Sequence, residues 1–500
     1  MELTTILAAA AAVLATLYLY YSYRFSYWRK RGVPFPRPLP FLGNIGFFFA
    51  GKKGFSSAML DLVAPFKENG YCGMYMWSQP VLLVWDPEMT RQIICKDFSS
   101  FHDRGQPSDE NDPLSQHLFN LNGNKWRNLR NRLTPTFTSG KLKLMLPMMR
   151  DIASQLSSHV ATEAKRADEV EIDALLSRYA VDVIGSVAFG IECNSLRDKD
   201  NEFISMSRKL GRTSAVGFVR FILIGIHPKL GALLPLKWMF SDTHRFFLNL
   251  MKETVEYREQ HDVERNDFVQ LMMQLRSADL ANVDPANHMA LTHGVMAAQA
   301  LIFFLAGLDS VSNTIAFALS RLGADPELQQ RLADEVREVL RRHAGELSYE
   351  ALKEMDLLHR VVLEAMRLWN PAGILFRKCN ATTQVGDLVV EKGQVLFIMA
   401  QVTAMDEGTF PDPHRFDPGR HTPEAKQARH PYAFLPFGDG PRNCIAERFA
   451  MLEMKLTVAL LVRDFVFTPG PNYEPEVELD PKNFFPRAKN GFHLKVSARA

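Results

Sequence analysis

One cysteine lies in a sequence setting that suits a reactive or metal-bound thiolate. Cys444 follows a run rich in glycine and proline at residues 436–441, and an apolar pattern with helical period begins directly after it, at Ile445. A thiolate just before a helix N-terminus is stabilised by the unpaired backbone N–H groups there, and Arg442 adds a positive charge at which an anionic group can dock. As an axial ligand, such a thiolate pushes electron density onto haem iron and favours O–O cleavage. The alternative is a small apolar side chain packed in a tight turn.

An acid and a hydroxyl interrupt a long apolar segment. Residues 290–322 contain no proline and are long enough for one helix of about 50 Å. Within this segment, Asp309 and Ser310 follow Gly307, a residue that weakens a helix. A carboxyl group in apolar surroundings is costly unless it has a partner or a function. The segment alone leaves two interpretations open: a functional pair, or a pair that satisfies local backbone groups.

A glutamate and an arginine three residues apart, Glu364 and Arg367, lie on one face of a predicted helix, where an ion pair is geometrically natural. By itself the spacing says little, because the chain repeats it elsewhere. We expect the other three pairs to be solvated: Glu88–Arg91, Glu163–Arg166 and Glu338–Arg341.

The elements that must position these residues are mainly helical with a minor sheet, an α+β pattern. Short alternating runs at residues 72–77 and 81–85 predict a hairpin, and residues 394–400 predict a late strand. Asp325 followed by Pro326 predicts the capped start of a helix with one apolar face. No repeat, low-complexity tract or long linker divides residues 46–500, which we expect to form one large catalytic domain.

Composition argues against several other classes of protein. Lysine and arginine total 58 against 56 for aspartate and glutamate, so the net charge gives no support for a nucleic-acid partner. The five cysteines are odd in number, widely spaced and without a Cys-x-x-Cys pair, which argues against a disulfide scaffold or a structural zinc site. We therefore expect the bulk of the chain to face a reducing compartment.

The first 45 residues predict a membrane attachment. Residues 3–23 carry no charge, and as a helix they just cross a hydrocarbon core of roughly 30 Å. Four basic residues follow before position 32, a bias that places the downstream chain in the cytosol. A cleavable signal peptide is the less favoured alternative, because the apolar run is long and a basic stop follows. We expect residues 1–23 to form a single transmembrane anchor, and residues 24–45 a basic stop and a stiff proline-rich spacer.

These features together resemble the cytochrome P-450 superfamily. Its haem loop reads Phe-x-x-Gly-x-Arg-x-Cys-x-Gly or Ala. The chain matches this pattern at Phe437, Gly440, Arg442, Cys444 and Ala446. Four further segments match in the order and spacing of the family: Trp126 with Arg130, Ala306-Gly307 with Asp309-Ser310, Glu364 with Arg367, and the segment from Pro413 to Arg420.

The resemblance implies a fold and a role for each residue. The fold would be that of a cytochrome P-450, preceded by one transmembrane helix. Cys444 would bind the iron of haem b as the axial thiolate, and Asp309 and Ser310 would deliver protons. Further haem contacts would come from Trp126, Arg130, Ala306, Arg377, Phe437 and Arg442. A buried hydrogen-bonded network would join Glu364, Arg367 and Arg420. The substrate pocket would be lined by Phe119, Ile302, Leu305, Ala372 and Leu375.

The chain departs from the commonest family pattern at a few positions. Ser310 stands where threonine is common; it keeps the hydroxyl and loses the methyl group that restricts its rotamers. Asn370 stands where proline is common. Gly419 and His421 vary the residues around Arg420, which makes the local backbone of Arg420 less certain than its identity.

The family's activity is the expectation for this chain. It would insert one atom of O2 into lipophilic substrates, xenobiotics or endogenous lipids, with electrons from NADPH through a membrane-bound NADPH–cytochrome P-450 reductase. The anchor, the spacer and residues 101–105 are most similar to insect microsomal enzymes that oxidise xenobiotics, which implies the endoplasmic reticulum membrane. Membrane lipids are expected partners, cytochrome b5 is left open as a second donor, and no nucleic acid is expected.

Two alternatives of other kinds stay open. One is a haem enzyme of the same fold that rearranges peroxides without O2 or a reductase, against which the pair Asp309 and Ser310 argues. The other is a non-catalytic haem-binding or lipid-binding membrane protein. Turnover that depends on NADPH would separate both from a monooxygenase.

Overall fold

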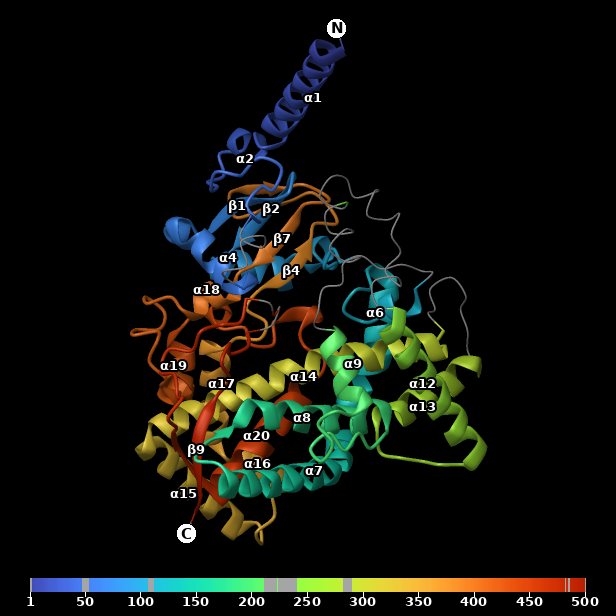
Figure 1. The fold of residues 1–500 in the computed structure, drawn as a ribbon, viewed down its shortest axis with the longest axis vertical. Coiled ribbons are helices and arrows are strands. Elements are labelled where there is room, and N and C mark those ends of the chain that lie inside the picture. Colours follow the sequence, from blue (N-terminus) through green and yellow to red (C-terminus); the bar gives the residue numbers. More distant parts are fainter. Residues whose placement is uncertain are drawn as a thin grey trace.

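The protein consists of a small four-stranded sheet at one end and a larger helical body at the other (Figure 1). The computed structural model describes residues 2–46, 54–106, 112–210, 223, 241–281, 290–481, 483 and 486–499. Helices make up most of the described residues, so the prediction of a mainly helical chain with a minor sheet is confirmed.

The helices in these ranges are α1 (Glu2–Arg24), α2 (Tyr27–Lys30), α4 (Phe55–Val63), α5 (Pro87–Arg91), α6 (Gly123–Leu133), α7 (Ser139–Arg166), α8 (Ile172–Ile184), α9 (Glu202–Leu210), α12 (Ser241–His261), α13 (Phe268–Ala281), α14 (His293–Ala324), α15 (Pro326–Arg342), α16 (Tyr349–Glu354), α17 (Asp356–Leu368), α18 (Ala400–Ala404), α19 (Pro423–Ala428) and α20 (Glu447–Asp464). The strands are β1 (Tyr71–Met76), β2 (Gln79–Val84), β3 (Val170–Glu171), β4 (Leu375–Lys378), β5 (Thr383–Val385), β6 (Leu388–Val390), β7 (Val395–Ile398), β8 (Phe465–Pro469) and β9 (His493–Ala498).

The four-stranded sheet joins segments that lie far apart in the chain, in the order β1-β2-β7-β4. β1 and β2 form the predicted hairpin, with Cys72 opposite Leu83. β7, the predicted late strand, runs parallel to β2 and antiparallel to β4. The pairing of β7 with β4 places Arg377 opposite Leu396. The sheet therefore connects β4, which carries Arg377, to the N-terminal hairpin through β7.

The long apolar segment forms α14, the central helix of the helical body (Figure 1). The side chain of Thr292 accepts a hydrogen bond from the backbone N–H of Val295 and caps its start. α14 packs against α8, α12, α17 and α20, so that most of its side chains are buried. The prediction of one long helix through the molecule is confirmed.

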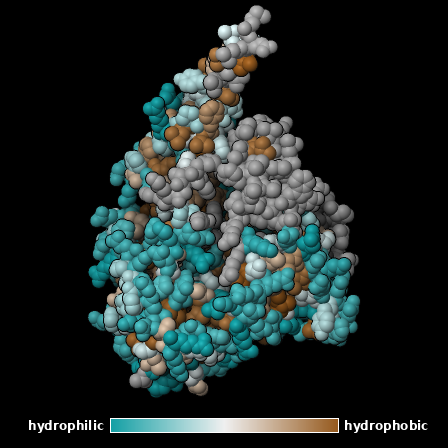
Figure 2. All heavy atoms as spheres, viewed as in Figure 1, coloured by the Kyte–Doolittle hydropathy of each residue, from teal (hydrophilic) through white to brown (hydrophobic). Residues whose placement is uncertain are grey.

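The N-terminal helix α1 extends away from the sheet (Figure 1). Its apolar side chains Ile6, Leu7 and Leu19 are exposed, and Figure 2 shows hydrophobic residues along it. Within the described ranges, the helix with the length and hydropathy of a membrane span is α14, and half of that apolar window is buried inside the protein. Burial identifies α14 as a core helix, and the anchor at residues 1–23 stays a prediction.

The segment predicted as a spacer lies against the sheet. The indole N–H of Trp28 donates to the backbone carbonyl of Met74 at 3.0 Å, and the N–H of Gly73 donates to the carbonyl of Pro34 at 2.8 Å. Trp28 and Val33 are buried in the same apolar cluster as Tyr75. The chain that leaves α1 is therefore held on the domain from residue 28 onward.

The start of α15 offers a test of local stability. The carboxylate of Asp325 accepts a hydrogen bond from the N–H of Leu328 at 2.9 Å, as the sequence predicts. We expect Asp325→Ala to lower the free energy of unfolding by about 1 kcal/mol, because the N–H loses its acceptor. Urea denaturation followed by circular dichroism measures the change. Asp325→Asn keeps an acceptor and should stay close to the parent; equal losses in both variants would contradict the capping role.

Candidate active site

A large cavity of about 320 Å³ lies between α14 and the loop that carries Cys444. Ile302, Ala306 and Ser310 line it from α14. The loop at residues 436–446 and the first turns of α20 form another wall. Its lining is mostly apolar, and its charged residues in the described part of the chain are four arginines and Glu453. The cavity therefore brings together the Cys444 loop, the groove on α14 and the segment that carries Trp126 and Arg130.

The Cys444 loop is shaped by close packing of its backbone. Gly440 has a φ of 70°, and a Cβ atom there would lie 2.2 Å from the carbonyl oxygen of Ile94. The N–H of Cys444 donates to the carbonyl of Phe437 at 2.9 Å, which closes the turn. α20 begins at Glu447, two residues later than the pattern suggested, because Ile445 and Ala446 still belong to the turn. Both Phe437 and Cys444 line the cavity.

Burial opposes ionisation of the Cys444 thiol. It raises the pKa of Cys444, while the backbone N–H of Ala446 and the guanidinium groups of Arg130 and Arg104 lower it. The helix-start effect expected from the sequence is thus present but is outweighed by burial. A metal ion bound at the sulfur deprotonates a thiol outright, so a metal partner would remove this barrier.

Four arginines line the cavity in the part nearest Cys444 and the sheet: Arg104, Arg130, Arg377 and Arg442. Burial and repulsion from Arg377 and Arg442 hold the pKa of Arg104 well below its usual range. Burial likewise lowers the pKa of Arg377 to about 10 and that of Arg442 to about 9. Among the described residues, Asp103 is the one carboxylate within 4.0 Å of any of these groups, at 3.7 Å from Arg442 Nη2.

Their hydrogen bonds go mainly to backbone carbonyl groups. Arg442 donates to the carbonyl groups of His102 and Leu121, each at 2.8 Å, and its guanidinium carbon lies 4.0 Å from the ring centroid of Trp126. Arg130 donates to the carbonyl of Asn443 at 2.8 Å. The buried Nε of Arg377 has no hydrogen-bond partner among the described residues. Several buried positive charges with few acids and an unused donor suit an anionic ligand.

The groove on α14 contains the predicted hydroxyl. The hydroxyl of Ser310 donates to the backbone carbonyl of Ala306, and both residues line the cavity. Asp309 lies outside the lining, and burial raises the pKa of its carboxyl group. Leu305 is also outside the lining and packs against the core. Successive residues of an α-helix are rotated by about 100° around its axis. The residues of α14 that line the cavity therefore share one face, and Leu305 and Asp309 lie on another face of the helix.

The remaining predicted pocket residues line the same cavity: Phe119, Ala372 and Leu375. Phe119 comes from the loop before α6, and the other two come from the segment that leads into and begins β4. Trp126 lines it from α6. Tertiary packing therefore gathers these side chains from chain segments that are more than 200 residues apart.

A buried network surrounds Glu364 on α17. Arg367 donates to both carboxylate oxygens of Glu364 at 2.8 Å, and neither side chain is exposed. The N–H of Asp417 donates to the same carboxylate at 3.0 Å. Hydrogen bonds from Arg367 and His421 lower the pKa of Glu364 below its usual value, although burial acts in the opposite direction. The pairing and the lowered pKa both favour the ionised form of Glu364.

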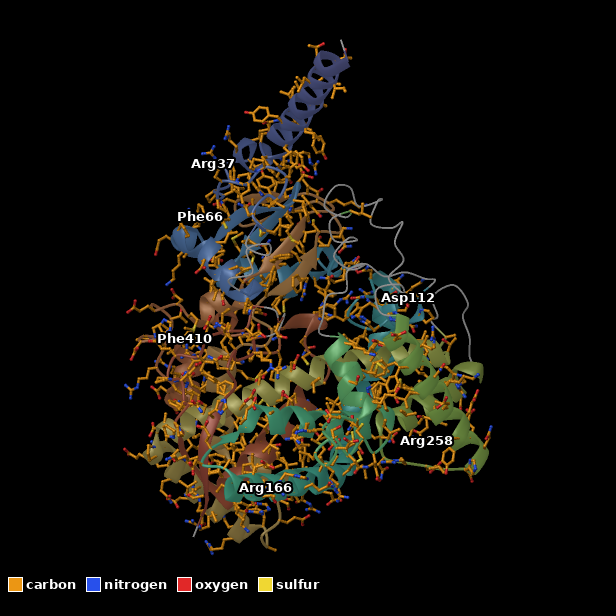
Figure 3. The ribbon with its side chains drawn as sticks, viewed as in Figure 1. Arg37, Phe66, Asp112, Arg166, Arg258 and Phe410 are labelled. Carbon is orange, nitrogen blue, oxygen red and sulfur yellow. The ribbon has the colours of Figure 1, made fainter. Side chains whose placement is uncertain are left out.

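Arg420 and His421 share the remaining contact with Glu364. Arg420 Nε lies 3.5 Å from the carboxylate, whereas His421 Nε2 lies 2.9 Å from it and is fully buried. The Arg367 guanidinium also donates to the carbonyl groups of Ala404 and Pro413, and it lies 5.1 Å from the ring centroid of Phe410. Figure 3 shows Phe410 on the side of the molecule where α18 and α19 lie.

The comparisons with known proteins agree with this geometry. The cytochrome P450 family profile matches residues 33–496. The chain belongs to the cytochrome P450 family. It is 35% identical to cytochrome P450 6a2 of Drosophila melanogaster over 98% of each chain. It is 34% identical to cytochrome P450 6A1 of Musca domestica, over 100% of this chain and 99% of the relative. It is also 34% identical to cytochrome P450 6B2 of Helicoverpa armigera, over 98% of each chain.

Membership of this monooxygenase family implies a haem-thiolate cofactor, and the residues of this P450 fit one. Haem is a flat apolar ring with two carboxylates and a central iron. The cavity offers a single thiol on one wall, apolar side chains around it, and a cluster of arginines with the unused Arg377 Nε for the carboxylates. Among the described residues, no group of three His, Cys, Asp or Glu side chains is placed to hold a free metal ion.

Sequence reasoning missed three residues that complete the P450 site. Arg104 lies in the cavity, and its segment, residues 101–105, drew notice only as a likeness to insect enzymes. His421 was noted as a departure from the family, not as a partner of Glu364. Gln299 on α14 accepts from the N–H of Leu118 at 2.8 Å and donates to the carbonyl of Gln116 at 3.0 Å, which holds the loop of Phe119. No local pattern pointed to Gln299.

Removal of Glu364 should destabilise the protein severely. We expect Glu364→Ala to lower the free energy of unfolding by about 3–5 kcal/mol and to yield little haem-loaded protein, because Arg367 becomes an unpaired buried charge. Haem content per protein and urea denaturation measure the effect. Glu338→Ala is a matched control, because the Glu338–Arg341 pair has the same spacing and is exposed. Its stability should stay at the parent value; a similar loss in both variants would refute the role of the buried network.

Proposed function

We propose that this P450 inserts one atom of O2 into lipophilic substrates, with electrons from NADPH delivered by a membrane-bound reductase. The observation that carries the proposal is the placement of Cys444 and Ser310 on different walls of one apolar cavity. A lone packed cysteine would not need a serine groove in the same cavity. Family membership supports the reaction class, and the lining of the cavity supports the kind of substrate.

Cys444 is the residue that holds the haem iron in this proposal. When bound, haem supplies the binding and activation of O2 that amino-acid side chains lack. The four cavity arginines would hold its carboxylates, and Trp126 packs beside Arg442. The hydrogen bonds of Arg130 to Asn443 and of Cys444 to Phe437 keep the thiolate loop in one position. These contacts would preorganise the loop, because they fix the position of Cys444 through hydrogen bonds within the protein.

Ser310 and Asp309 handle protons in the proposed reaction. The Ser310 Oγ atom faces the cavity and keeps a lone pair free after its own proton goes to the Ala306 carbonyl. Burial raises the pKa of Asp309, so this carboxyl group keeps a proton to donate up to a higher pH than a solvated aspartate does. Because Asp309 lies outside the lining, a proton from Asp309 would need a bridging water molecule to reach Ser310 Oγ.

The substrate is lipophilic because the part of the cavity beyond the arginines is apolar. Phe119, Ile302, Ala372 and Leu375 contribute to it, and Phe303 and Phe268 extend it with rings whose centroids are 4.6 Å apart. Burial of a carbon chain or ring there gains roughly 25 cal/mol per Å² of apolar surface. Among the described residues, the carboxyl group that lines this cavity is that of Glu453 on α20, so the apolar side chains offer a cationic substrate few partners.

The N-terminus places the enzyme at a membrane in this proposal. α1 has 23 residues with exposed apolar side chains, and four basic residues lie at or just after its end. We infer a single-pass anchor at residues 1–23, a basic and proline-rich segment at 24–45, and the haem domain at 46–500 on the cytosolic face of the endoplasmic reticulum. A membrane-bound reductase then meets the domain from the same surface.

Cys444→Ala tests the proposed function. We expect the variant to lose its haem or the thiolate-type spectrum of the reduced protein with carbon monoxide, because the iron loses its anionic ligand. NADPH-dependent oxidation of a lipophilic substrate panel with reductase should stop. Cys193→Ala is the matched control, since this cysteine is outside the cavity. Haem retention and oxidation at the parent rate in the Cys444 variant would refute the proposal, and a parent without turnover would favour a non-catalytic or peroxide-rearranging protein.

Ser310→Thr tests the proton groove separately. The added methyl group restricts the rotamers of the side chain, so we expect more product per NADPH oxidised and less hydrogen peroxide than in the parent. Both are measured in the reconstituted system. Ser310→Ala removes the hydroxyl and should change both quantities in the opposite direction. Unchanged coupling in the threonine variant would show that the hydroxyl rotamer does not limit proton delivery.

A further inference from the structure

The cavity wall on α20 contains a carboxyl group that the proposed reaction does not use. Glu453 is fully buried and lines the cavity one helical turn beyond Phe449 and Ala450. α20 leads directly out of the Cys444 loop, so Glu453 lies on the wall that also carries the thiol. Neither oxygen of the Glu453 side chain has a hydrogen-bond partner among the described residues.

An unpartnered buried carboxyl group needs an explanation. Leaving such a group without hydrogen bonds costs about 1–3 kcal/mol, more when it is charged. Burial raises the pKa of Glu453 to about 8, with no contribution from a neighbouring cation. At neutral pH the group is therefore mainly a protonated acid, and it can still lose its proton within the range of pH in which proteins are stable. Many apolar side chains would fill the same space at lower cost.

Few other ionisable groups face Glu453. Tyr179 on α8 is close enough for a charged Glu453 to raise its pKa, and its hydroxyl lies 2.9 Å from Thr457 Oγ1. Thr457 in turn donates to the backbone carbonyl of Glu453 at 2.8 Å. Lys455, on the same helix, is influenced instead by Glu335 on α15 and Asp356 on α17. Within the described residues, α7, α14 and the other elements packed on α20 place no charged group close enough to shift the pKa of Glu453.

We propose that at alkaline pH, where Glu453 is ionised in the oxidised protein, it takes up a proton when the haem is reduced, so that electron transfer into the cavity is coupled to protonation of this carboxylate. The inference rests on the haem site of the proposed function. One electron from the reductase would reduce the haem iron, and one proton would come from solvent: an O–H bond of a hydronium ion or a water molecule breaks as an O–H bond forms at a Glu453 side-chain oxygen. The added negative charge is then balanced inside the apolar wall.

The coupling follows from electrostatics in a medium of low polarity. A new negative charge in the cavity raises the pKa of a nearby carboxyl group, because two like charges there repel strongly. By reciprocity, protonation of Glu453 makes reduction more favourable. Glu453 thus affects the reduction of the haem through its charge. It is not a catalytic residue, because it exchanges no proton with the substrate.

The midpoint potential of the haem, measured against pH in the full-length protein, tests the proposal. Below about pH 8, Glu453 is protonated in both redox states and the potential should be flat. Above this pH, the reduction equilibrium constant should fall by up to about tenfold per pH unit, or about 59 mV for one electron. Glu453→Gln cannot ionise, and its potential should stay flat over the same range.

Glu338→Gln is the matched control, because it removes one exposed carboxylate far from the cavity. It should keep the slope of the parent. A parent potential that does not vary with pH, or a slope retained in Glu453→Gln, would overturn the proposal. Potentials are compared only for proteins with the thiolate-type carbon-monoxide spectrum, so loss of that spectrum in the parent would sink the proposed function, whereas a flat potential sinks only this inference.

If the Glu453→Gln variant fails to bind haem, a second measurement on the unaltered protein tests the proposal. In the unaltered protein above about pH 8, the reduced-minus-oxidised infrared spectrum should gain the carbonyl stretch of a protonated carboxylic acid. Isotopic labelling of glutamate and exchange into heavy water assign the band. Its appearance on reduction supports the proposal, and its absence overturns it.

Discussion

Four guanidinium groups meet beside the thiol of Cys444, and the described residues place one carboxylate, Asp103, within 4.0 Å of them. Such charges stay buried because their N–H groups are used by backbone carbonyl oxygens, as in the bonds of Arg442 to His102 and Leu121. Carbonyl groups satisfy the hydrogen bonds without neutralising the charge. The end of the cavity at the arginines therefore keeps a net positive charge, which an anionic cofactor would neutralise. Binding of that cofactor would thereby stabilise the folded interior.

The arginines also determine which segments of the chain can lie together. Arg442 ties the thiolate loop to the loops before α6, and Arg367 ties α17 to the carbonyl groups of Ala404 and Pro413. A guanidinium group suits this role because it presents five donors in a rigid plane. Both arginines are fully buried or nearly so. Removing either arginine would leave several backbone carbonyl oxygens without a hydrogen-bond donor at once. Each arginine therefore stabilises the packing of several chain segments against one another.

α14 divides the interior into a cavity face and a packed face. Ala306 and Ser310 leave room on the first, while Phe304 and Leu301 are buried on the second. Glu453 approaches from α20 on the wall of the thiol, so polar groups reach the cavity from both sides of an otherwise apolar space. In a medium of low polarity, burial alone raises the pKa of Glu453, and it is the main cause of the raised pKa of Asp309. Which of these groups carry a proton therefore depends on how deeply the fold buries them, as well as on the type of residue.

The sequence by itself determined the elements whose signals are local. Alternation specified the β1–β2 hairpin, Asp325 and Pro326 specified the start of α15, an uninterrupted apolar run specified α14, and the glycine-rich run before Cys444 specified the turn of the thiolate loop. These predictions succeeded because backbone geometry, capping and turn formation depend on neighbours within a few residues.

Only the tertiary structure decided which side chains from distant segments contact one another. It turned Leu305 and Asp309 away from the cavity, brought Arg104 to the other three arginines, and placed His421 closer than Arg420 to Glu364. It also left the Glu453 side chain without a hydrogen-bond partner among the described residues, and it placed Trp28 against the sheet. Each outcome depends on the rotation of a helix or the path of a loop relative to segments far along the chain. Packing between such segments sets these quantities, and no spacing within one of them encodes the result.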